Sequence, residues 1–131
     1  MLNGILSITG QSGLFKLVSQ AKNSIIIESL IDGHRMPAYP SSRVSSLEDI
    51  SMYTEDGDIK LEEVFLKIFD FTNGAKAIDP KSNPDELKSY MEKILPNYDK
   101  QRVYVSDIKK LFTWYNLLVE KNMIKKKEEK E

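Results

Sequence analysis

The hydrophobic spacing of this chain changes once, near residues 55–58, and that change constrains the fold more than any other feature. Before it, short apolar segments are separated by glycine and proline, and residues 14–20 alternate between two sides as a strand does. After it, apolar residues recur at helical spacing over longer segments. We therefore expect an α+β fold, with a β-rich module over residues 1–54 and a helical module over residues 55–122. The acidic turn between them is expected to lie within one cooperative unit.

The first module is expected to contain short antiparallel strands. Asp32-Gly33 predicts a tight hairpin, because glycine adopts the left-handed backbone of such a turn at little cost. Pro37 and Pro40 have no amide hydrogen, so the strand that carries Pro37 should be short or lie at an edge. Short strands with tight turns are typical of an SH3-like β-barrel or of a curled antiparallel sheet, and both alternatives stay open. The expected strands are residues 2–8, 14–20, 24–30, 35–39 and 50–54.

Three helices are predicted in the second module. Asp58 is placed to cap the first helix. The second helix has the most complete start signal, with a capping Asn83, Pro84 in the first turn and Glu86 three residues after the cap. The predicted helices lie near residues 59–71, 84–95 and 106–121.

The third predicted helix is apolar around most of its circumference. A helix that packs on one side does not need so wide an apolar sector, so this one is either central to its module or in contact with a partner. Central burial is favoured, because a small module has few other residues from which to build a core. In the other alternative Trp114 and Leu117 form a candidate interface, for example between two copies of the chain. The narrow polar stripe consists of Lys109, Thr113, Asn116 and Glu120.

Charge and composition narrow the function classes. The chain has 131 residues, of which 40% are apolar and 30% charged, as in globular proteins. Four basic residues face seven acidic ones up to Ile59, and the basic surplus lies in the lysine-rich tail, residues 123–131, which we expect to be disordered. A domain that grips phosphate backbones is usually more basic than this. The absence of cysteine excludes disulfides and thiolate metal sites.

No residue pattern predicts catalysis. His34 is the only histidine and lies in the expected hairpin turn, where a solvated side chain is the better interpretation. The acidic residues 55–58 lack the spacing of a calcium-binding loop. The carboxylate pairs 48–49 and 62–63 are adjacent in sequence and therefore point apart. We expect no catalytic residue, metal, cofactor or small-molecule substrate, and hence no enzyme.

Binding remains the open class of function. Aromatic and basic residues of the first module, if exposed, would form a stacking platform for a peptide or a nucleic-acid strand. The alternative is that the aromatic residues belong to the core, and the lysine-rich tail would add phosphate contacts only in the nucleic-acid case. The candidate binding surface consists of Phe15, Arg35, Tyr39, Arg43 and Tyr53.

No membrane segment is expected. The longest purely apolar runs fall far short of the roughly 18 residues that a membrane-spanning helix requires. The first residues lack the charged and apolar regions of a secretory signal. We therefore expect a cytoplasmic protein.

Six segments of the chain carry a resemblance to a known family: residues 4–8, 13–20, 43–51, 76–80, 102–110 and 114–118. Through them the chain resembles an uncharacterised family of short bacterial proteins catalogued as a domain of unknown function. The resemblance implies a two-module fold, and the family has no assigned activity to carry over. With the residue analysis, it leaves a non-enzymatic macromolecular binding or adaptor protein as the leading hypothesis, with a protein partner, and a nucleic-acid-binding protein as the alternative.

Overall fold

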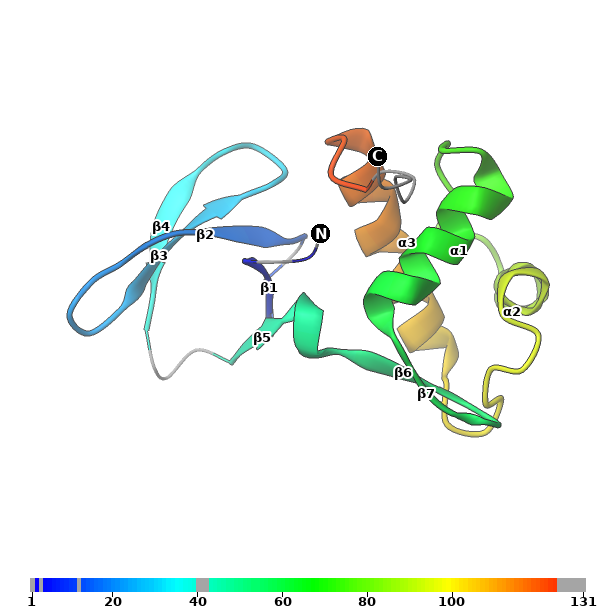
Figure 1. Cartoon of the computed structure of the whole chain (residues 1–131). Coiled ribbons are helices and arrows are strands. Elements are labelled where there is room, and N and C mark those ends of the chain that lie inside the picture. The colour runs from blue at the N-terminus through cyan, green and yellow to red at the C-terminus, as the bar shows by residue number, and fades with distance from the viewer. Residues whose placement is uncertain (1, 3, 12, 40–42, 125–131) are drawn as a thin grey trace, which may run out of the picture. The chain divides into compact units, whose positions relative to one another are not determined.

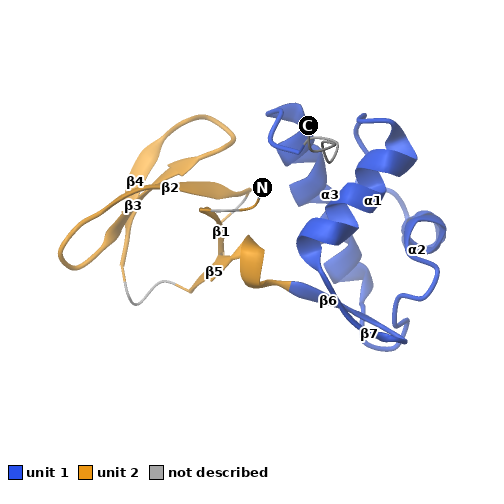
Figure 2. Ribbon diagram, in the orientation of Figure 1, with its two compact units in different colours: residues 1, 51–131 blue, residues 2–50 orange. Residues whose placement is uncertain are grey.

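The computed structural model describes residues 2, 4–11, 13–39 and 43–124 (Figure 1). The chain divides into two compact units, residues 2–50 and residues from Ser51 onward, which Figure 2 distinguishes by colour. The expected α+β class is confirmed, with strands in the first unit and three helices in the second. The boundary between the units follows Ile50 and so precedes the expected boundary at Thr54. We call these parts the β unit and the helical unit.

The β unit is a five-stranded antiparallel sheet that is not closed into a barrel. Its strand order is β4-β3-β2-β1-β5, so β4 and β5 are the two edges, as Pro37 predicted for β4. Among the described residues no pairing joins β4 to β5, and the SH3-like barrel is not confirmed. The strands are β1 (Ile5–Ile8), β2 (Phe15–Gln20), β3 (Ile25–Ser29), β4 (Arg35–Ala38) and β5 (Val44–Ser46), followed by the 3₁₀ turn η1 (Leu47–Asp49).

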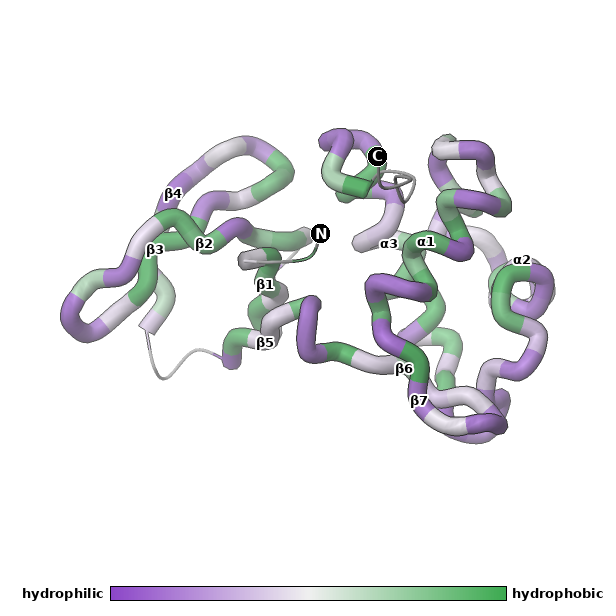
Figure 3. Tube along the Cα trace, viewed as in Figure 1, coloured by the Kyte–Doolittle hydropathy of each residue, from purple (hydrophilic) through white to green (hydrophobic). Residues whose placement is uncertain are grey.

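One face of this sheet forms an apolar core. Figure 3 shows hydrophobic residues along β1 and β3. Phe15 pairs with Leu6 of β1 and is only 2% exposed. The prediction that Phe15 belongs to an exposed platform is therefore wrong, because alternation along β2 places it on the inward face with Leu17. The buried members of this core are Leu6, Ile8, Phe15, Ile27 and Ala38.

The helical unit begins with a β-hairpin. The segment expected as the last strand of the β module is instead β6 (Ser51–Thr54), which pairs with β7 (Gly57–Lys60). Asp58 therefore lies in a strand opposite Tyr53 and does not cap a helix. Gly57 has φ +116°, a backbone conformation that glycine tolerates and other residues rarely adopt. This conformation lets the chain reverse directly into β7 and delays the first helix.

The three helices lie close to their predicted positions. They are α1 (Leu61–Thr72), α2 (Pro84–Ile94) and α3 (Val105–Glu120). The predicted cap of α2 is confirmed, since Asn83 Oδ1 accepts the Glu86 backbone N–H at 2.9 Å. One aromatic residue from each helix contributes to a stack in which Tyr90 of α2 meets Phe71 of α1 and Phe112 of α3 edge to face, both at 5.4 Å. No helix in the described part of the chain has the length and apolar character needed to cross a membrane.

The apolar residues of α3 are not all buried to the same degree. Trp114 and Leu117 are half-buried, so their role as an interface stays a prediction. After α3, Met123 donates its backbone N–H to Leu118 and Ile124 is buried, which places the first two residues of the predicted disordered tail in the folded unit. Residues 125–131 lie outside the described part of the chain. The fully buried side of α3 consists of Ile108, Leu111, Phe112, Tyr115 and Leu118.

Candidate binding site

The β unit has a pocket of about 440 Å³ between its two edge strands. Ala38 and Tyr39 reach it from the end of β4, and Val44 reaches it from the start of β5. The turn between β2 and β3 closes a third side. We call this the seam pocket, because it lies where a closed barrel would join β4 to β5. Its lining residues are Gln20, Ala21, Lys22, Asn23, Ser24, Ile25, Ala38, Tyr39 and Val44.

The curl of the sheet builds this pocket. Ile25 pairs with Ala38 across β3 and β4, whereas Val44 pairs with Ile8 on the far side of the sheet. Ile25 and Val44 nevertheless pack against the same buried core, which also contains Ile8 and Ala38. The two edges of the sheet therefore face each other across one apolar interior, and the seam pocket is the part of that interior left open.

The chemistry of the seam pocket is that of a binding surface. Tyr39 is 54% exposed, a high value for an aromatic side chain that does not serve the core. Among the lining residues that the structure describes, Lys22 is the only charged one and none carries a carboxylate. Apolar walls with a few polar groups at one side are typical of ligand pockets, whose volumes run from roughly 300 to 1,000 Å³. The pocket thus suits an apolar group with a polar or negatively charged neighbour.

The structure does not bring the five predicted surface residues together. Tyr39 lines the seam pocket and Arg43 directly precedes Val44 in the chain. Arg35 lies at the other end of β4, where its Nε is 2.9 Å from Glu28 Oε1. Phe15 is buried in the core, as described above. The fifth, Tyr53, belongs to the helical unit.

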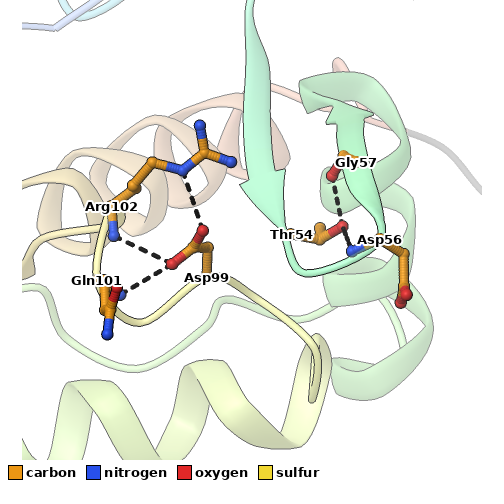
Figure 4. Close-up of polar contacts among 6 residues, drawn as sticks. All are labelled: Thr54, Asp56, Gly57, Asp99, Gln101 and Arg102. Carbon is orange, nitrogen blue, oxygen red and sulfur yellow. Dashed lines mark hydrogen bonds and ion pairs between the residues drawn. The ribbon is translucent and has the colours of Figure 1, made fainter.

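Tyr53 contacts a separate polar cluster around Asp99 and Arg102. Figure 4 shows the hydrogen bonds that Asp99 accepts in this cluster. The guanidinium of Arg102 lies over the Tyr53 ring at 4.2 Å, and Arg102 Nε donates to Asp99 Oδ2 at 3.0 Å. Asp99 Oδ1 also accepts backbone N–H groups, and the hydrogen bond from Arg102 is the main cause of the lowered pKa of the Asp99 carboxyl. The Asp99 backbone N–H in turn donates to the Tyr53 carbonyl at 3.0 Å. This arrangement ties the segment before α3 to β6.

The turn of the same hairpin is fixed by Thr54. Its hydroxyl donates to the Gly57 carbonyl and accepts the Asp56 backbone N–H at 3.1 Å (Figure 4). The side chain of Asn97 donates to Asp56 at 2.7 Å. The carboxylate of Asp56 therefore serves local hydrogen bonding within the helical unit.

A second pocket, of about 570 Å³, runs along α2. Two acidic residues and a lysine line it, and Tyr90 forms part of its wall. Burial raises the pKa of the Tyr90 hydroxyl, whose usual value of about 10 already keeps it neutral at physiological pH. Because its walls carry charges of both signs and Tyr90 already serves the aromatic stack, this pocket has less of the character of a binding site than the seam pocket. Its lining residues are Ile78, Ser82, Asp85, Glu86, Ser89, Tyr90 and Lys93.

His34 and the carboxylates do not form a reactive cluster in the described residues. His34 is exposed, and its backbone N–H donates to Asp32 Oδ1 at 3.0 Å. That hydrogen bond is the main cause of the lowered pKa of the Asp32 carboxyl. Within residues 4–11, 13–39 and 43–124, no three potential metal ligands gather.

Most residues of the seam pocket were absent from the predicted surface. Residues 20–24 form a polar turn, and Val44 falls in a segment expected to be a connection without a strand. A signal for β5 was present in Val44, since β-branched residues favour strands. It was too short to be recognised without its partner β1.

Two family models match the chain. The domain of unknown function DUF5606 matches residues 2–47, and the domain of unknown function DUF6852 matches residues 50–118. The solution NMR structure of a protein from Bacteroides vulgatus is also similar, with 45% sequence identity and a TM-score of 0.78 over 95% of this chain and 90% of that one. No curated protein matches. These matches confirm the expected resemblance to an uncharacterised family.

Proposed function

This chain belongs to the family of the domain of unknown function DUF6852, and we propose that it is a non-enzymatic binding or adaptor protein that holds a protein partner at its seam pocket. The observation that carries this proposal is the exposed Tyr39 beside an open apolar interior. Tyrosine is enriched where protein interfaces bury a central aromatic side chain. A cytoplasmic location is part of the same proposal.

The seam pocket also supports the non-enzymatic part of the proposal. The titratable side chains among its described lining residues are Lys22 and Tyr39, so these residues offer no carboxylate or imidazole for proton transfer. Substrate turnover would need such a pair or a nucleophile with an adjacent base. Binding needs neither.

We further propose that the β unit is a partly open form of an SH3-like barrel. Five short antiparallel strands curl around one core, and the edges β4 and β5 face each other across it. Barrel-like modules of this size commonly bind ligands on an open face or between loops. The seam pocket would occupy the place where the barrel remains unjoined.

Nucleic-acid binding is the second candidate function. The cations of the β unit that favour it are Lys22 beside the pocket and the exposed Arg43. Arg35 is engaged with Glu28, and the chain as a whole carries a formal charge of −1, so the electrostatic contribution to phosphate binding would be small. We therefore rank this alternative below a protein partner.

The proposal is tested by affinity capture from a native lysate with the full chain and two variants. Tyr39→Ala removes the exposed ring of the seam pocket, whereas Tyr104→Ala removes a tyrosine of the helical unit that is exposed at least as much. We expect a captured protein that is lost with Tyr39→Ala, retained with Tyr104→Ala and insensitive to nuclease. A captured set that is identical for all three proteins would contradict the proposal, and nuclease sensitivity would favour the second candidate.

A further inference from the structure

The chemistry of the seam pocket identifies the kind of partner segment it accepts. Building on the proposed function, we infer that this pocket binds an extended, acidic segment of a protein partner that inserts one apolar side chain between Tyr39 and Val44. Three observations carry the inference: the apolar walls, the backbone groups along β5, and the positive charge of Lys22 in the lining.

The apolar walls select the inserted side chain. Ile25, Ala38 and Val44 contribute aliphatic groups, and Tyr39 contributes an aromatic ring that is already half out of the protein. Burying an aliphatic side chain against such walls is favourable in proportion to the apolar area removed from water. A polar side chain at the same place would lose its water contacts with few partners in return.

The edge of β5 selects an extended backbone. The hydrogen bond from Thr9 N–H to the Arg43 carbonyl fixes the alternation of the ladder, so that Ser45 faces β1 while Val44 and Ser46 direct their backbone N–H groups outward. In the described residues neither of these N–H groups has a backbone acceptor. An added strand would pair with them while its side chains alternate toward the pocket.

The edge of β4 is less suited to the same role. The Ser29 N–H donates to the His34 carbonyl, so Arg35 and Pro37 are the residues of β4 whose backbone groups point away from β3. Pro37 has no N–H to donate, which removes one of the two outward donors of this edge. A partner strand therefore finds its donors on β5.

The charge of the lining favours an acidic segment. Lys22 lines the pocket, and among the described residues no acidic side chain contributes to the lining. The acids Glu28 and Asp32 lie near the last residue of β3 or in the turn after it, whereas the pocket lies at its first residue, Ile25. Glu28 is also paired with Arg35. Complementary charge of this kind governs which partner is chosen more than it raises affinity.

The test uses the full chain, labelled with ¹⁵N, and synthetic peptides of about six residues, the usual length of one strand. The first peptide has a central leucine flanked by glutamate and aspartate. A second has lysine in place of the acids, and a third has serine in place of leucine. A single-stranded oligonucleotide is the fourth probe. Amide shifts report where each probe binds.

We expect the acidic leucine peptide to shift the amides of residues 22–25, Tyr39 and Val44, and the other peptides to bind at least about tenfold more weakly. Lys22→Ala should weaken the acidic peptide at least about threefold, while Lys88→Ala, an exposed lysine on α2, should leave it unchanged. Equal binding of the lysine peptide, or shifts confined to other residues, would overturn the inference, as would binding of the oligonucleotide alone.

Failure of this inference is distinguishable from failure of the proposed function. If the acidic peptide causes no shift but a captured protein still depends on Tyr39, the seam pocket binds proteins and the acidic, extended segment is wrong. If neither the peptide nor any captured protein depends on the seam pocket, both statements fall.

Discussion

Asn116 of α3 accepts the backbone N–H of Ala77 on its side-chain Oδ1 at 2.7 Å. Its Nδ2 donates to the next carbonyl, that of Ile78, at 3.4 Å. The neighbouring Tyr115 hydroxyl donates to the Ala75 carbonyl at 3.0 Å. Side chains of α3 therefore hold the connection between α1 and α2 by hydrogen bonds to the backbone of that connection. Two segments that the sequence comparison treated separately, residues 76–80 and 114–118, are in direct contact.

Replacing Asn116 tests whether this contact stabilises the connection. Asn116→Ala leaves the half-buried Ala77 N–H without its acceptor, and we expect the helical unit to lose about 1 to 2 kcal/mol of unfolding free energy. Thr113→Ala on the exposed side of α3 is the control and should cost less. Amide exchange should show loss of protection at Ala77 in the first variant only. Unchanged protection there would contradict the role of Asn116.

Tyr115 should make stability depend on alkaline pH. Burial raises the pKa of its hydroxyl, so the neutral form contributes stability that is complete below about pH 10 and is lost as the pH rises above it. Tyr115→Phe removes the contacts to Thr72 and Ala75 and should cost about 1 to 2 kcal/mol near neutral pH.

The difference between wild type and Tyr115→Phe should shrink above about pH 10. Chemical denaturation followed by the helical circular dichroism signal measures it. A constant difference across that range would show that the hydroxyl does not titrate with folding. Burial also raises the pKa values of Tyr90 and Tyr98, so some alkaline sensitivity should remain in the variant.

Asp99 should make stability depend on acidic pH. Its pKa is lowered by the hydrogen bond from Arg102, so its contribution is present above the usual value of about 4 and is lost as the pH falls through the lowered pKa. Asp99→Asn should lower the Tm at pH 7 but not at a pH below the folded pKa, where the wild-type carboxyl is protonated too. Thermal denaturation at the two pH values measures this, and an equal Tm difference at both would contradict it.

Pro37 should protect the β4 edge from pairing with other chains. Pro37→Val adds an outward N–H and a side chain that favours strands, so we expect stronger concentration-dependent association than in wild type, measured by light scattering. Pro37→Lys adds the same N–H with a charge that opposes pairing, and should associate less than the valine variant. Equal association of all three proteins would count against this role.

The sequence predicted elements best where a local signal decides them. The cap at Asn83 and the turn at Asp32-Gly33 depend on neighbouring residues, and each fixes its helix or hairpin. The edge position of β4 followed from the missing amide hydrogen of Pro37 alone. These features require no knowledge of distant partners.

Features set by distant pairing were not predictable in this way. The strand at 51–54 reads as β structure in either module, and only its pairing with β7 assigns it to the helical unit. β5 has three residues and exists because β1 is beside it. The burial of Phe15 and the neighbours of Tyr39 were not predictable for the same reason, since both depend on how the sheet curls.

Photo-crosslinking in cells tests the central claim most directly. p-Benzoylphenylalanine is placed at position 39 in the seam pocket or, as the control, at position 104, replacing two exposed tyrosines. The account predicts a discrete, nuclease-resistant protein adduct from position 39 and none of that mass from position 104. The absence of any adduct from position 39, or the same adducts from both positions, would contradict a protein-binding role for the seam pocket.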